Sequence, residues 1–253
     1  MKGIILGCGS SAGVPNLYKQ YGNCDPKNPK NNRCRTALLL EKEGFYLLFD
    51  TPPEIRLELK NAGFPPIHSL VFTHLHADHT AGINDLKAFA DEKPLPVYLN
   101  AADEDNFHRR FYYLISDDKE MDKYSHGFNL NPVYPMQEIK IGPFTLLPLL
   151  QKHGEGQSLG FRIDNFAYST DLNAMQDDTF EALKGIDTWV LGCVSVKENN
   201  KHLYLAKALQ WIDIIRPRRV YLTHMGTTMD YATLCKELSP HVRPGYDGMT
   251  FDV

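Results

Sequence analysis

The segment VFTHLHADHTAG, residues 71–82, contains four side chains that can bind metal ions, all within a stretch of six residues. They are His74, His76, Asp78 and His79. His74 and His76 are two residues apart at the end of an apolar run, and on an extended backbone such residues point to the same side. Asp78 and His79 are adjacent, so they cannot easily join the ion that His74 and His76 share. The spacing therefore predicts two neighbouring metal ions.

This segment supplies only two ligands for each ion, whereas a catalytic metal needs about three protein ligands and a water. The remaining ligands must come from elsewhere in the chain. Three candidates in the second half each follow an apolar run: His153, Asp171 and His224. Each stands where a strand is expected to end, so we expect all three to lie at the same edge of the fold.

Apolar patterning predicts the elements that must position these residues. In the first half we expect strands at 3–9, 36–51 (two strands with a turn at 41–44) and 68–74, and helices at 52–64 and 81–90. In the second half we expect strands at 144–154, 159–164, 165–171, 188–194 and 218–224, and helices at 178–185 and 202–217.

The two halves resemble each other. LVFTH ends at His74 and VYLTH ends at His224, while LLFDT at 47–51 is similar to AYSTD at 167–171. We interpret the halves as two similar layers of sheet and helix packed sheet to sheet, a four-layer αββα sandwich of the α/β class in one domain, 1–253. Chance similarity between buried strands is the alternative.

Residues 101–135 interrupt this scheme. We expect a helix at 101–115, followed by a polar, turn-rich stretch at 116–135. An irregular helix-loop insert at this place would either cover a pocket or lie at the periphery, and the sequence leaves both alternatives open.

Taken together, the motifs resemble the metallo-β-lactamase superfamily over nearly the whole chain. Within it they are most similar to the phosphodiesterase branch, which includes phosphoribosyl cyclic phosphodiesterases and ribonuclease Z. The stretches that carry this likeness, besides His-x-His-x-Asp-His, are GCGSSAGVP (7–15), CDPKNPKNNRCRTALL (24–39), AGINDLK (81–87) and YDGM (246–249). The resemblance implies the metallo-β-lactamase fold.

The resemblance also implies two divalent ions per chain, zinc or manganese, with iron as a further option. The implied ligands are His74, His76 and His153 for the first ion, Asp78, His79 and His224 for the second, and Asp171 as the bridge. Asp50 matches a family position that is usually structural, so we do not count it as a ligand.

One part of the family pattern is incomplete. The cyclic phosphodiesterases carry extra cysteines in the early loop, which form a structural zinc site with a late histidine. Here only Cys24 and Cys34 are present, and Thr227 stands where that histidine would be. Two cysteines are too few for a closed four-ligand site, so we expect no structural zinc.

The net charge expected for the metal site indicates the class of substrate. Two divalent ions, two aspartates and a bridging hydroxide leave the site near a charge of +1, which suits a phosphodiester. Paired metals activate water and stabilise both the attacking and the leaving oxygen. Asp78 and His202 are the predicted catalytic residues, with His202 protonating the leaving alkoxide. The alternative for His202 is a surface residue at a helix N-terminus.

Two features near the N-terminus suit a phosphate. The glycines of LGCGSSAG at 6–13 offer backbone N–H groups. The local basic stretch Lys27, Lys30, Arg33 and Arg35 would steer an anionic substrate. Both features are also common in proteins that bind no phosphate, and basic stretches are usually only solvated.

Composition limits the partners. The 253 residues are 43% hydrophobic and 23% charged with a net charge of −4, so we expect neither duplex nucleic acid nor a membrane as a partner. Five scattered cysteines and the lack of a signal-like apolar segment predict a cytoplasmic protein with reduced thiols. The oligomeric state stays open, with a homodimer as one option.

The predicted function is therefore a binuclear metal-dependent hydrolase that cuts a small cyclic or nucleotide-like phosphodiester through a metal-bridging hydroxide. Two alternatives remain. A thioester or lactone hydrolase would use the same metals, although His202 favours phosphate chemistry. A non-enzymatic carrier of the same fold is the other, although the intact ligand set argues against it.

Overall fold

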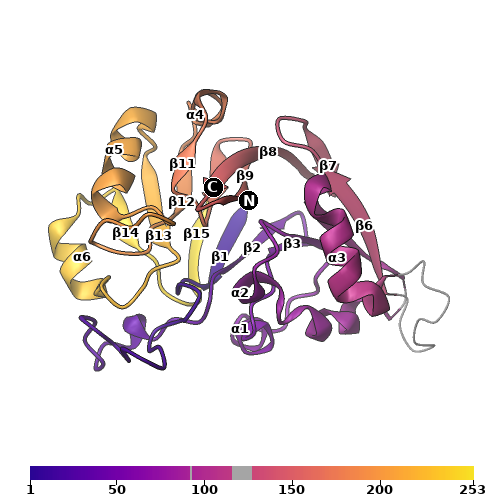
Figure 1. The fold of residues 1–253 in the computed structure, drawn as a ribbon, viewed down its shortest axis with the longest axis horizontal. Coiled ribbons are helices and arrows are strands. Elements are labelled where there is room, and N and C mark those ends of the chain that lie inside the picture. Colours follow the sequence, from indigo (N-terminus) through magenta and orange to yellow (C-terminus); the bar gives the residue numbers. More distant parts are fainter. Residues whose placement is uncertain (92, 116–126) are drawn as a thin grey trace.

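Two β-sheets lie face to face between two layers of helices, as the computed structural model shows for residues 1–91, 93–115 and 127–253. In Figure 1 the helices of the first half cover one side and those of the second half cover the other. The predicted αββα sandwich is therefore confirmed.

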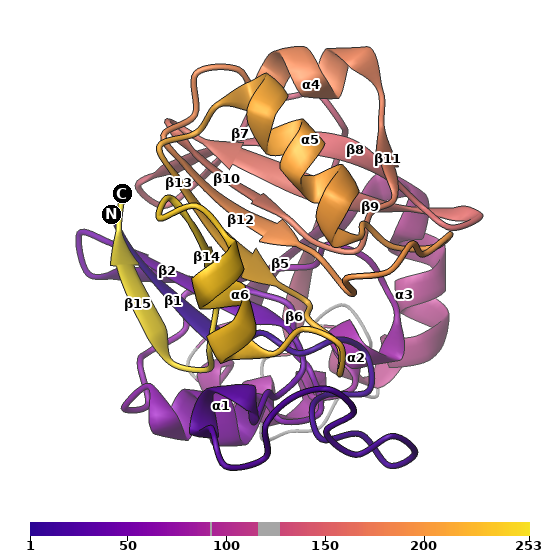
Figure 2. The same ribbon diagram turned by 90° about the vertical axis from the view of Figure 1, so that its left-hand side faces the viewer.

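The first sheet has seven strands in the order β15-β1-β2-β3-β4-β5-β6. Their bounds are β1 Lys2–Gly7, β2 Ala37–Lys42, β3 Phe45–Phe49, β4 Ser69–Val71, β5 Leu95–Asn100, β6 Phe128–Val133 and β15 Met249–Asp252. Pairing is antiparallel from β15 to β3 and parallel from β3 to β6. Because β15 pairs with β1, the two ends of the chain lie side by side in both views (Figures 1 and 2).

The second sheet has the order β11-β8-β9-β10-β12-β13-β14, and β7 also pairs with β8. Its strands are β7 Ile139–Ile141, β8 Phe144–His153, β9 Gly156–Ile163, β10 Phe166–Ser169, β11 Ala174–Met175, β12 Thr188–Gly192, β13 Arg219–Thr223 and β14 Val242–Pro244. Pairing is antiparallel from β8 to β10 and parallel from β10 to β14.

The similarity between the halves holds in their topology but only partly in their sequence motifs. In each sheet an antiparallel part is followed by parallel strands, so β3 corresponds to β10 and β4 to β12. This agrees with the sequence similarity between LLFDT at 47–51 and AYSTD at 167–171. However, β13, which precedes His224, lies one strand further along than β12. LVFTH and VYLTH are thus similar in sequence, but their strands do not hold equivalent positions in the two sheets.

The helices are short, and their bounds are α1 Ile55–Asn61, α2 Ala77–Thr80, α3 Glu104–Phe111, α4 Asp177–Leu183, α5 Leu205–Ile215 and α6 Tyr231–Glu237. Short 3₁₀ helices lie at Pro29–Asn31, Ile83–Phe89, Ala101–Asp103 and Tyr112–Leu114. None of the helices in the described ranges has the length and apolar character to cross a membrane.

Strands β2, β3 and β4 of the first sheet are largely apolar on both faces because both faces are largely buried. Along β2, Leu38 and Leu40 belong to the core between the sheets, whereas Leu39 belongs to the core beneath the first helical layer. Successive strand residues point to opposite faces. This explains the continuous run ALLL, which an exposed sheet face would have interrupted with polar residues.

Three expectations differ from the structure. Helix 81–90 is a 3₁₀ helix, Ile83–Phe89, that follows the single α-turn of α2. The helix predicted at 202–217 begins only at Leu205. The insert 101–135 is helical at its start, but 128–133 forms strand β6, and 116–126 lie outside the described residues.

Several elements had no expected counterpart: strands β5, β6, β7, β11, β14 and β15 and helix α6. Pro96 lies within β5 and Pro132 within β6. Proline lacks the backbone N–H that a strand donates, which makes such segments resemble loops in a sequence.

Candidate metal centre

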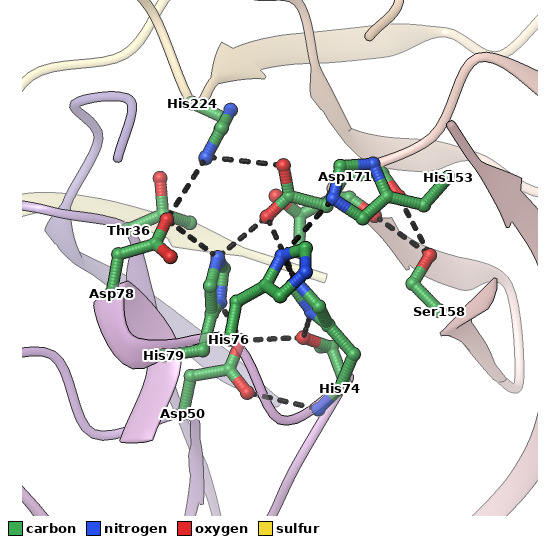
Figure 3. A network of polar contacts seen from close by, with 12 residues as sticks. Thr36, Asp50, His74, His76, Asp78, His79, His153, Ser158, Asp171 and His224 are labelled. Atoms are coloured by element: carbon green, nitrogen blue, oxygen red, sulfur yellow. Dashed lines mark hydrogen bonds and ion pairs between the residues drawn. The ribbon is translucent and has the colours of Figure 1, made fainter. Parts of the chain in front are cut away.

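The seven predicted ligands meet at one edge of the two sheets, where several strands end (Figure 3). His74 follows β4, His153 is the last residue of β8, and Asp171 and His224 follow β10 and β13. The remaining three are carried by the loop and helix after β4: His76, Asp78 and His79. The edge therefore gathers residues that are separated by more than half of the chain.

Backbone conformation turns three of the strand-end residues toward the site. Asp50, Asp171 and His224 have φ angles of 64°, 48° and 54°. Residues other than glycine seldom adopt this left-handed conformation, and it tends to occur at functional sites. Each of these side chains contacts another residue of the site.

One set of ligand atoms, which we call the His74 group, consists of His74, His76 and His153. His76 Nδ1 lies 2.9 Å from His74 Nε2 and 3.2 Å from His153 Nε2. All the ligand atoms of this group lie within 4.8 Å of one another. Three imidazole nitrogens converging in this way match the ligand set predicted for the first ion.

The second set, which we call the Asp78 group, consists of Asp78, His79, Asp171 and His224. Its ligand atoms also lie within 4.8 Å of one another. His79 Nε2 is 3.3 Å from Asp78 Oδ2, and His224 Nε2 is 3.7 Å from the same oxygen. Two imidazoles and two carboxylates thus face a common point.

Asp171 lies between the two groups. Its Oδ2 is 2.5 Å from His79 Nε2 and 3.7 Å from His74 Nε2. Its side chain is almost completely buried, and Ser158 Oγ donates a hydrogen bond of 2.7 Å to its backbone carbonyl. One buried carboxylate therefore connects both sets of imidazoles.

Residues behind the site orient the imidazoles. Asp50 accepts hydrogen bonds from the backbone N–H and hydroxyl of Thr73 and lies 2.7 Å from His79 Nδ1. His74 Nδ1 lies 3.1 Å from the Thr73 hydroxyl, and His153 Nδ1 donates to the carbonyl of Lys201 at 3.2 Å. In each ring the second nitrogen is engaged, which leaves Nε2 for the site. Asp50 has the structural position that the sequence predicted.

The charges of the site keep its carboxylates ionised. Burial by itself raises the pKa of Asp171, but His224 and His79 outweigh burial and hold this pKa well below its usual range. Burial also acts to raise the pKa of Asp78, but the neighbouring imidazoles of His224 and His79 reverse this effect, so the pKa is lowered. Both side chains therefore carry the negative charge that a divalent cation prefers.

Several buried atoms of the site lack a hydrogen bond of good geometry: His79 Nε2, both carboxylate oxygens of Asp171, His202 Nδ1 and His224 Nε2. Buried polar atoms rarely remain without such a partner. Ions between these atoms would satisfy them with ligands of the type and number that divalent metals accept. The residues present thus fit a metal centre.

His202 lies beside this centre but not at a helix start. It is three residues before α5, and its backbone N–H donates to Asn199 Oδ1 at 3.0 Å. Its Nδ1 is 2.9 Å from Asp171 Oδ1, and it forms a third compact group with Asp171 and His153. The helix expected to begin at His202 therefore begins three residues later, and His202 lies in a loop with its imidazole next to Asp171.

Most of the basic stretch is committed to internal contacts. The buried Arg33 donates to the Met229 carbonyl at 2.6 Å and to Asn31 Oδ1 at 3.0 Å. Arg35 forms an ion pair with Glu54. Arg33 is thus a structural residue, because burial removes it from any substrate. Only the exposed Lys27 keeps the character expected of a steering residue.

Lys30, the fourth basic residue, lies over the rings of Tyr231 and Tyr246. The neighbouring glycine loop is also engaged. Gly9 donates its backbone N–H to the Cys34 carbonyl at 2.7 Å, and Ser10 donates to the Met225 carbonyl at 3.1 Å. The Ser10 donor connects the loop to the residue after His224 and so helps to place His224, and neither of these N–H groups is free for a phosphate.

Arg110 supports the centre without having been predicted. Arg110 lies on α3, in the insert, and donates to the Leu75 carbonyl and, at 3.0 Å, to the Thr80 hydroxyl. Leu75 stands between His74 and His76 in the sequence, so α3 braces the metal-binding segment. One arginine in a polar helix carries no sequence signal for such a contact.

The chain is similar to known proteins in sequence and in fold. The chain is 29% identical over 255 residues to an octanoyltransferase of Porphyromonas gingivalis, covering 98% of this chain and 51% of that protein. The chain thus spans about half the length of that relative.

Among the solved structures that share the fold are a diphosphatase and a tRNase Z. A diphosphatase from the PhnP family has a TM-score of 0.91 at 24% identity, covering 100% of this chain and 98% of its own. The short form of human tRNase Z has a TM-score of 0.71 at 17% identity, covering 100% of this chain and 99% of its own. Residues 46–225, which include all seven candidate ligands, match the β-lactamase superfamily domain. The chain therefore belongs to the β-lactamase superfamily, a superfamily of hydrolases.

Proposed function

We propose that the chain is a binuclear metal-dependent phosphodiesterase acting on a small molecule. The observation that carries the proposal is the position of the buried Asp171 carboxylate, which lies between the His74 group and the Asp78 group. In this assignment the His74 group holds one divalent ion, the Asp78 group holds the other, and Asp171 is shared. When bound, the ions lower the pKa of water and stabilise negative charge on phosphoryl oxygens.

The charge of the proposed centre favours an anionic substrate. Two divalent ions would add four positive charges, the carboxylates of Asp78 and Asp171 remove two, and a hydroxide would remove one more. A phosphodiester carries one negative charge and so complements the remainder, whereas a lactone or thioester carbonyl is neutral. Zinc and manganese both accept a mixed histidine and carboxylate set.

His202 is the proposed proton donor to the leaving oxygen. Its Nδ1 lies 2.9 Å from Asp171 Oδ1, an arrangement in which Nε2, on the other side of the ring, remains for the substrate. The side chain is 19% exposed, so substrate and solvent have access. An alkoxide leaving group has a high pKa and needs such a proton, which contributes about 10²–10⁴-fold to the rate.

The test replaces His202 by alanine and compares two leaving groups. We expect kcat to fall about 10²–10⁴-fold on a diester with an alkoxide leaving group. The loss should be much smaller on a p-nitrophenyl diester, because p-nitrophenolate leaves without a proton. Metal content should stay at two equivalents, which also distinguishes a proton donor from a third metal ligand.

Three results would argue against this role. Equal losses on both diesters would indicate phosphate binding, a lost equivalent of metal would indicate ligation, and unchanged kcat would leave His202 without a catalytic part. Lys197→Ala is a control for the same loop, since Lys197 is exposed and lies five residues before His202.

A second candidate is the hydrolysis of an acyl thioester on the same ions. The specific observation in its favour is the octanoyltransferase relative, which matches 98% of this chain. Assays of the metal-loaded protein against phosphodiesters, acyl thioesters and lactones decide between the two. Turnover of thioesters alone would replace the phosphodiesterase proposal, and no turnover with metal bound would favour a carrier.

A further inference from the structure

We infer that Asn173 is a positioning residue that sets the place of His202 relative to the metal centre. The inference rests on the role proposed for His202. Asn173 is two residues after Asp171, in the segment between β10 and β11. Neither its backbone nor its side chain belongs to the ligand groups, yet it contacts the segments that carry His153 and His202.

Asn173 holds the hairpin that ends at His153. Its backbone N–H donates to the Lys152 carbonyl at 2.8 Å, and its Oδ1 accepts from the Gly154 N–H at 3.3 Å. Lys152 and Gly154 flank His153 on either side. The hairpin is therefore joined to the Asp171 segment at both neighbours of the ligand.

The same side chain also holds the loop before α5. Asn173 Nδ2 donates to the Asn200 carbonyl at 2.6 Å. Asn200 belongs to a turn in which Asn199 Oδ1 accepts from the backbone N–H groups of Lys201 and His202 at 2.8 and 3.0 Å. This turn fixes the backbone of His202, and Asn173 connects the turn to the sheet.

Two further contacts complete this connection. Lys207, on α5, donates to the Asn173 carbonyl at 2.7 Å, and Leu203 donates its N–H to the Leu172 carbonyl at 2.6 Å. The segment 172–173 thus contacts the His202 loop on both sides of the histidine. Displacement of the loop would move the imidazole away from Asp171, while Asp171 itself is held through Ser158.

The chemistry at position 173 requires an amide. One end of the side chain accepts from Gly154 and the other donates to Asn200, and asparagine supplies both functions. Aspartate has the same shape but only accepts. In Asn173→Asp the Gly154 contact survives, whereas a carboxylate oxygen faces the Asn200 carbonyl and repels it.

The experiment measures two variants, Asn173→Asp and Asn173→Ala, with the same pair of diesters. We expect kcat on the alkoxide-leaving diester to fall about 10–100-fold, the usual range for a supporting residue. On the p-nitrophenyl diester the loss should stay below about threefold, because that reaction does not need His202. Metal content should equal that of the unmodified protein.

The double variant Asn173→Asp/His202→Ala shows whether Asn173 acts through His202. If it does, the double variant is no slower than His202→Ala alone, since residues that act as a unit are not additive. Multiplied losses would overturn the inference. Asn129→Asp, the same change at an exposed asparagine of β6, is the matched control.

The outcomes separate this inference from the proposed function. If His202→Ala has no dependence on the leaving group, the proposed role of His202 fails. If His202→Ala shows that dependence and the Asn173 variants show equal losses on both diesters, no loss, or a loss of metal, only the inference about Asn173 fails.

Discussion

The two halves of the molecule supply the candidate ligands in different ways. In the first half, His74, His76, Asp78 and His79 come from one short segment between β4 and the end of α2. In the second half, the candidates come from the ends of three separate strands, β8, β10 and β13. The first set can take its arrangement from local backbone geometry, but the second exists only when the sheet has formed.

Both sets are supported by residues from other parts of the chain. Asp50, which follows β3, supports His79 of the first set. Ser158 and the Lys201 carbonyl support Asp171 and His153 of the second set. The sets differ in how they serve the two groups. Asp171, in the second set, lies between both groups, so its substitution should disturb both, whereas substitution of a residue that belongs to one group should disturb that group alone.

The largest effect is expected for Asp171→Ala. Because Asp171 lies between both groups, its loss should remove metal from both, and activity should fall by more than the roughly 10–100-fold that follows loss of a supporting residue. Elemental analysis after metal loading measures the first effect and kcat the second. His76→Ala, at the exposed member of the His74 group, should retain about one equivalent. Retention of a full equivalent by Asp171→Ala would contradict the shared position.

A smaller effect is expected for Asp50→Ala, which leaves every proposed ligand in place. His79 then loses the carboxylate 2.7 Å from its Nδ1. Metal affinity should weaken about 10–100-fold, measured by competition with a chelator. Asp164→Ala removes an exposed carboxylate that pairs with Lys42 at 3.6 Å, and affinity should not change. Equal affinity in both variants would show that Asp50 does not support the centre.

The smallest effect on the metal centre is expected for Arg33→Met. This substitution should lower the stability of the fold and leave metal binding unchanged. Arg33 connects the early loop to the segment after His224. Its loss leaves the buried Met229 carbonyl without this donor and removes one of the two donors to Asn31 Oδ1. Unfolding free energy should fall by about 1–3 kcal/mol, measured with denaturant, while metal content stays unchanged.

Cys24→Ser provides the companion measurement. Cys24 Sγ lies 3.9 Å from Arg33 Nη1, and we expect this substitution to alter neither metal content nor activity. A loss of one metal equivalent in Cys24→Ser would reveal a structural zinc in the early loop. That result would refute the prediction that the chain has no structural zinc.

Local sequence patterns were sufficient for part of this description. Alternation and apolar runs predicted most strands of both sheets, and the spacing of His74 to His79 predicted two groups of ligand atoms. The pattern was insufficient where a residue contradicts its element, as Pro96 does in β5. It also misplaced the start of α5, because HLY continues an apolar pattern although the chain is still a loop before Leu205.

The sequence by itself determined that a pair of metal sites was to be expected, because spacings of one and two residues set which side chains can share an ion. Only the tertiary structure decided which distant residues complete them and what holds them. Asp171 reaches both groups because β10 ends at the same edge as β4, and Arg110 and Asn173 act through backbone carbonyl and N–H groups. Nearly every residue offers the same backbone groups, so the sequence alone does not indicate which of them a given side chain will contact in the folded protein.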